Sequence, residues 1–205
     1  MPAPRLLICG FRAFPAAPRN PAAATVEALD RAGWTPPGLR TSYLTLPVAW
    51  RGSAQAVEAR LVDAPVDGIL LVGVAVAAMA FRVETAARNS ACATRLDQQG
   101  ELWPTGPIVP AGPPQLSVSA PTQAMAEAIG AAGLPVALSS DAGDYLCNFT
   151  LYRLLHGPAA SKVGFLHLPQ VREYAKESAF GLADVTIAVQ AAAGAFALSL
   201  PAWRP

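Results

Sequence analysis

The chain has 205 residues, of which 53% are hydrophobic and 14% charged, and its formal net charge at pH 7 is +1. This length supports one sizeable core, so we expect a single domain over residues 1–205. A near-neutral charge without a basic run argues against nucleic-acid binding. Three cysteines without CxxC spacing argue against a disulfide framework or a metal site and suit a reducing cytoplasm.

The amino-terminal third alternates apolar runs with helical patterns. The apolar run at residues 6–11 predicts a buried first strand, which makes Cys9 a core residue. Pro21 is well placed to open a helix that ends near Gly33. Further elements are expected as a strand at 39–48, a helix at 53–61 with Ser53 as its N-cap, and a central strand, apolar on both faces, at 68–74.

The rest of the chain continues this alternation after one irregular stretch. Residues 90–120 are dense in proline and glycine, which predicts a binding surface, a lid or an oligomer contact. A helix at 121–132, strands at 135–138 and 161–169, and a helix at 178–200 follow. Asp184 and Gln190 interrupt the apolar final helix, so we expect it to be buried or in a subunit contact and not in a membrane. The order predicts an α/β/α sandwich with a largely parallel sheet.

Cys147 lies where a short apolar run turns into a helical pattern, within residues 139–156. A thiol near a helix start experiences the positive end of the helix dipole, which favours the thiolate and makes a nucleophile. The alternative is that Cys147 is a small buried hydrophobic residue. The histidines of the chain bear on this choice.

Of the two histidines, only one is a candidate general base for Cys147. His156 follows it by nine residues, roughly 13 Å along a continuous helix and beyond hydrogen-bond reach. His167 closes a strand-like run, and the carboxyl ends of strands are where sites assemble in α/β sheets. The alternative is that His167 is an ordinary polar residue at a strand end, with its hydrogen bonds made by neighbouring groups. Glu84, Asp141 and Asp144 are the rival acids for orienting it.

Three motifs extend this pattern over most of the chain. They are AG-x-(aromatic)-x-CN at 142–148, GF-x-H-x-P at 164–169, and GF-x-x-F…NP at 10–21. In motif order, spacing and length, the sequence resembles the type I pyroglutamyl peptidases, cysteine exopeptidases that remove an N-terminal pyroglutamate. The resemblance implies a three-layer, phosphorylase/hydrolase-like sandwich with a mixed sheet, and a homodimer or homotetramer.

The resemblance also implies roles for individual residues, without metal or cofactor. Cys147 is the nucleophile, His167 the base and then the acid, and Glu84 the group that orients the imidazole. The assignment of Glu84 rests on a family pattern in which the glutamate is followed five residues later by an asparagine, which is Asn89 in this chain. The implied contacts with the pyroglutamyl ring are Phe11, Phe14 and Tyr145, with Asn20 supporting the loop. A site arginine of the family has Arg95 as its nearest match, although a direct count from Glu84 leads to Thr94.

The loops around the expected ring pocket depart from the family pattern. The family's PFGG stands here as AFPA at 13–16, and its glycine-rich run after VG stands as VAVA at 74–77. Loss of glycine stiffens both loops. The alternatives are therefore a related cysteine peptidase or amidase of altered specificity, or a non-catalytic homologue used for binding. Retention of Cys147, His167 and Glu84 together argues against the second.

Overall fold

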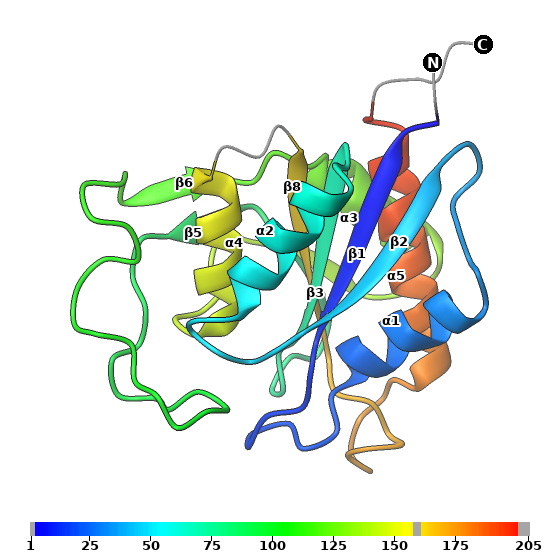
Figure 1. The fold of residues 1–205 in the computed structure, drawn as a ribbon. Coiled ribbons are helices and arrows are strands. Elements are labelled where there is room, and N and C mark those ends of the chain that lie inside the picture. Colours follow the sequence, from blue (N-terminus) through cyan, green and yellow to red (C-terminus); the bar gives the residue numbers. More distant parts are fainter. Residues whose placement is uncertain (1–2, 158–160, 201–205) are drawn as a thin grey trace.

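A six-stranded sheet in the order β2-β1-β3-β8-β4-β7 forms the centre of the computed structural model, which describes residues 3–157 and 161–200 (Figure 1). β4 pairs antiparallel with β8 and parallel with β7, whereas the other four strands are mutually parallel. The expected mixed, largely parallel sheet is confirmed. The strands are β1 (Arg5–Phe11), β2 (Arg40–Leu46), β3 (Gly68–Val74), β4 (Phe81–Glu84), β7 (Val136–Ser139) and β8 (Lys162–Leu168).

Helices cover both faces of this sheet and complete three layers (Figure 1). On one face the apolar sides of α1 (Pro21–Arg31), α3 (Thr122–Ala131) and α5 (Leu182–Ala197) share a core with the sheet. On the other face α2 (Ser53–Asp63) and α4 (Leu146–His156) share a second core with it. Because β3 lies between the two cores, every residue in it is buried, as its uniformly apolar sequence predicts.

One predicted N-cap and one predicted helix start are wrong. Gly52, not Ser53, holds the N-cap position of α2, and Ser53 lies inside the helix, where its hydroxyl accepts a hydrogen bond from Thr150 at 2.7 Å. The final helix begins four residues later than expected because the Asp184 carboxylate accepts the Gly181 N–H at 2.7 Å and fixes the first turn there.

Among the described residues, none of the helices has the length and apolar character needed to cross a membrane.

The irregular stretch after β4 is tied down at both ends. β5 (Ala86–Arg88) and β6 (Gln115–Ser117) form a separate antiparallel pair beside α4. Between them the Asn89 amide donates to the carbonyls of Val109 and Gly112 at 2.9 and 3.1 Å and accepts the Val109 N–H at 2.9 Å. The long loop is therefore anchored to the layer that carries Cys147.

Candidate active site

Cys147 is the second residue of α4, directly above the end of β3. The connection from β7 to α4 turns at Gly143, whose φ of +82° suits glycine. Beneath the thiol, Gly73 is required for another reason. A Cβ atom at this position would lie 2.9 Å from the Cys147 sulfur and 2.8 Å from the Phe165 ring. The absence of a side chain at Gly73 thus gives the sulfur its place against the sheet.

His167 and Glu84 come from the neighbouring strands β8 and β4. Their Nδ1 and Oε1 atoms are 2.8 Å apart, and both side chains are buried, with Glu84 fully inaccessible. His167 lies opposite Gly73 in the sheet register, and it lines the same cavity as Cys147, whose sulfur lies over Gly73. Since Glu84 occupies Nδ1, the other ring nitrogen is left for the sulfur. The three predicted residues are therefore brought together in the order Cys147, His167, Glu84.

The surroundings of His167 favour its protonated form. Burial by itself lowers the pKa of an imidazole. The negative charge and hydrogen bond of Cys147, and then the hydrogen bond and charge of Glu84, act in the opposite direction and outweigh burial. Together they raise the pKa of His167 to about 9. The site therefore supports an imidazolium at neutral pH.

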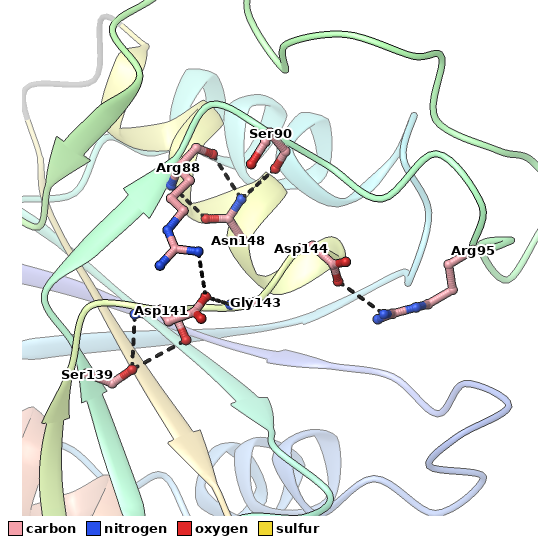
Figure 2. A network of polar contacts seen from close by, with 8 residues as sticks. All are labelled: Arg88, Ser90, Arg95, Ser139, Asp141, Gly143, Asp144 and Asn148. Atoms are coloured by element: carbon pink, nitrogen blue, oxygen red, sulfur yellow. Dashed lines mark hydrogen bonds and ion pairs between the residues drawn. The ribbon is translucent and has the colours of Figure 1, made fainter.

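The two rival acids are engaged elsewhere, as Figure 2 shows. Asp141 pairs with Arg88 at 3.5 Å, and Asp144 pairs with Arg95 at 3.1 Å; all four side chains are roughly half exposed. Neither carboxylate contacts the imidazole. Glu84 is thus the acid that adjoins the candidate base.

A cavity of about 360 Å³ opens onto the sulfur and the imidazole. Phe14 and Tyr145 form its aromatic wall, with their ring centroids 6.1 Å apart, and the β3–β4 loop contributes residues 74–76. An apolar wall with polar groups near the reacting atoms is the usual composition of a site for a small neutral ring. The arrangement is chemically that of a cysteine hydrolase with an adjoining ring pocket.

Comparison with known proteins agrees with this geometry. A family model described as pyroglutamyl peptidase matches residues 4–198. The chain belongs to the pyroglutamyl peptidase family. This confirms the resemblance expected from the three motifs.

Individual members of the family match over nearly the whole chain. A pyrrolidone-carboxylate peptidase of Levilactobacillus brevis is 33% identical over 173 residues, which cover 82% of this chain and 83% of that protein. The crystal structure of pyroglutamyl peptidase I from Bacillus amyloliquefaciens has a TM-score of 0.88 at 25% identity and 95% coverage of both chains. The pyrrolidone carboxyl peptidase from Thermus thermophilus has a TM-score of 0.83 at 29% identity, covering 92% of this chain and 98% of that one.

Of the remaining residues expected in a pyroglutamyl peptidase site, Asn20 lies in the supporting loop and Arg95 in the cavity wall, whereas Phe11 lies in the core. Asn20 caps α1 by accepting the Ala22 N–H at 3.0 Å, and it donates to the Arg12 carbonyl at 3.0 Å, so it supports the loop as expected. Arg95 lines the cavity, and its guanidinium lies 4.9 Å from the centroid of the Tyr145 ring. Phe11 does not line the cavity. It is 2% exposed and stacks on Phe165, because its position at the end of β1 directs it into the core.

Sequence reasoning gave no role to Asn148, the residue after the nucleophile. This buried amide accepts the Arg88 N–H at 2.8 Å and donates to the carbonyls of Arg88 and Ser90 at 2.9 Å each (Figure 2). It thereby ties the first turn of α4 to the end of β5. The CN pair in the family motif was the available signal.

The aromatic cluster under Tyr145 was also missed. Trp50 meets Tyr145 edge-on with centroids 5.2 Å apart, and it packs on Trp103 and Phe149 in turn. These residues come from segments far apart in sequence, so no local pattern links them.

Neither of the other two thiols lines the cavity. Cys9 is buried as predicted, and Cys92 contacts Thr94 at 3.3 Å.

Proposed function

We propose that Cys147, His167 and Glu84 form the catalytic triad with which this member of the pyroglutamyl peptidase family hydrolyses the bond after an N-terminal pyroglutamate. The observation that carries the proposal is that Cys147 and His167 line one cavity, while Glu84 is hydrogen-bonded to Nδ1 of the same imidazole at 2.8 Å. A buried carboxylate behind the imidazole is the arrangement that orients a base toward its nucleophile.

The chemistry proceeds in two stages. The Cys147 thiolate attacks the carbonyl carbon that joins pyroglutamate to the next residue, and the carbon–nitrogen bond breaks as the His167 imidazolium gives its proton to the leaving amine. A thioester remains. Water then attacks the thioester while the neutral imidazole takes its proton, and the carbon–sulfur bond breaks to release pyroglutamate. Glu84 holds one tautomer and stabilises the imidazolium throughout.

The first turn of α4 is the proposed source of oxyanion stabilisation. Backbone N–H groups at a helix start lack intrahelical acceptors, and those adjoining Cys147 are the proposed donors to the substrate oxygen on which negative charge develops. The positive end of the helix dipole also stabilises this negative charge. This helix start therefore favours both the attacking thiolate and the tetrahedral intermediate.

We place the pyroglutamyl ring against Phe14 and Tyr145. Phe14 sits on a closed turn, in which its N–H donates to the Ala17 carbonyl at 3.1 Å and its carbonyl accepts the Ala17 N–H at 2.8 Å. Tyr145 is held by its hydroxyl, which donates to the Leu96 carbonyl at 2.8 Å, and by Arg95 over its ring. The walls are thus preorganised. Phe11 supports the pocket from the core through Phe165.

A substrate panel tests the proposal directly. Pyroglutamyl, prolyl and alanyl derivatives of aminomethylcoumarin present the same leaving group with different first residues. Hydrolysis confined to the pyroglutamyl derivative supports the proposed function. Preference for prolyl or alanyl would instead indicate a related peptidase or amidase whose altered loops at 13–16 and 74–77 have changed its specificity. Turnover of none of them would indicate a non-catalytic homologue.

We further propose that the enzyme works in the cytoplasm as a homodimer or homotetramer. The proposed nucleophile must stay reduced, and all three cysteines are free thiols. The large apolar side chains of Val62 and Met79 are at least 80% exposed, which offers surface for subunit contacts. Light scattering coupled to size-exclusion chromatography measures the assembly, and a monomer at micromolar concentration would contradict it.

A further inference from the structure

Arg82 is a charged residue of the active-site cavity that the mechanism above does not use. It lines the cavity together with Cys147 and His167. In the antiparallel pairing of β4 with β8, its register partner is His167 itself. Residues directly opposite one another in such a pair project to the same face of the sheet. Arg82 therefore stands beside the imidazole, on the face that carries the sulfur.

Other charges of this cavity wall are already neutralised in pairs. Arg88 is matched by Asp141 and Arg95 by Asp144 (Figure 2). Arg82, by contrast, is exposed, and among the residues that the structure describes its guanidinium has neither a hydrogen-bond nor an ion-pair partner. Glu84 shares its face of β4 but is fully buried against His167. Within the described part of the chain, the cavity thus holds one cation without a counter-ion.

The strand order decides which part of a substrate Arg82 faces. Phe14 follows β1 and Arg82 lies in β4, with β3 and β8 between them. His167 on β8 thus separates the ring wall from Arg82. Because His167 protonates the leaving amine in the proposed mechanism, Arg82 lies on the leaving-group side of the scissile bond. A carboxylate on the residue after pyroglutamate falls on this side, and its α-carboxylate is attached to the carbon next to the leaving nitrogen.

We propose that Arg82 binds a carboxylate of the leaving residue and so directs the enzyme toward short pyroglutamyl peptides, above all dipeptides with a free C-terminus. The inference rests on the proposed function. A guanidinium is suited to this role because its planar fork donates two parallel hydrogen bonds to a carboxylate. A longer peptide satisfies the same site only when the residue after pyroglutamate carries an acidic side chain.

Two matched substrate pairs test the proposal. Pyroglutamyl-alanine and pyroglutamyl-alanine amide differ only in the α-carboxylate, whereas pyroglutamyl-glutamate amide and pyroglutamyl-glutamine amide differ only in a side-chain carboxylate. We expect wild-type kcat/KM to favour the free acid over the amide about tenfold, the usual scale of one charge-assisted hydrogen-bonded contact. A preference in the second pair identifies the side chain as a further source of the carboxylate.

Variants of Arg82 test whether this residue is the source of the preference for a carboxylate. In Arg82→Gln the ratio of acid to amide should fall to about one, mainly through KM, and Arg82→Lys should recover part of it because the charge is kept. Arg31→Gln, at an exposed position in the last turn of α1, is the matched control and should retain the wild-type ratio. No carboxylate preference in wild type, or one that survives in Arg82→Gln, would overturn the inference while leaving the proposed function intact. Lack of turnover of all four substrates by wild type would overturn both.

Discussion

At the scale of single residues, the protonation of His167 links structure to pH dependence. Its pKa of about 9 reflects Cys147 and Glu84 prevailing over burial. In the proposed mechanism the imidazolium is the acid for the leaving amine, so the alkaline limb of the pH profile reports its loss. Activity should therefore fall as pH rises past about 9, where His167 loses its proton.

Glu84→Gln tests this assignment. The substitution removes a negative charge that favours the imidazolium, so the pKa of His167 falls and the alkaline limb of kcat/KM should move to lower pH. The expected loss at the optimum is about 10²- to 10⁴-fold, the range for a triad acid that orients its base. Asp144→Asn is the control, because it also removes a carboxylate charge, but from a group that pairs with Arg95 and does not contact His167. An unmoved limb in Glu84→Gln would show that another group titrates there.

Phe14 and Phe11 allow catalysis and stability to be separated. Phe14 lines the cavity, so Phe14→Ala should lower kcat/KM for pyroglutamyl substrates by about 5- to 150-fold, the equivalent of about 1–3 kcal/mol of ring contact, with little change in Tm. Phe11 is in the core, so Phe11→Ala should instead lower the free energy of unfolding by about 3–5 kcal/mol. Activity assays and urea denaturation measure the two effects. The reverse pattern would place the ring pocket elsewhere.

At the scale of elements, the junction of α4 with β5 depends on Asn148. Asn148→Ala leaves one N–H and two carbonyls of residues 88–90 without their partner, which should cost about 2–4 kcal/mol of unfolding free energy and loosen the helix start that carries Cys147. We therefore expect kcat to fall as well.

Asn89→Ala is the matched control for this junction. It removes the side-chain hydrogen bonds that anchor the loop at 89–112 and leaves the contact between α4 and β5 in place. It should lower stability with a smaller loss of kcat. Urea denaturation and steady-state kinetics report both quantities. If Asn148→Ala proved as stable and active as wild type, the junction would have no part in positioning the nucleophile.

At the scale of the whole molecule, the layers and the grouping of Cys147, His167 and Glu84 were predictable from sequence, whereas several connections were not. Long apolar runs such as β3 carry a strong signal because both faces are buried. β4, which carries Glu84, was missed because its four residues alternate apolar with charged side chains over too short a stretch, whereas the equally short β7 is marked by an apolar run. Its antiparallel direction, and hence the position of Arg82 opposite His167, depends on tertiary pairing that no local pattern encodes.

The central claim is that Cys147 is the nucleophile for pyroglutamyl hydrolysis. The most direct measurement is kcat/KM for pyroglutamyl-aminomethylcoumarin in wild type, Cys147→Ala and Cys92→Ala, with circular dichroism to confirm the fold of each. Cys92 is the other accessible thiol and the appropriate control. We predict a loss of about 10⁴-fold or more in Cys147→Ala and near wild-type activity in Cys92→Ala. Turnover by folded Cys147→Ala within tenfold of wild type would contradict the claim.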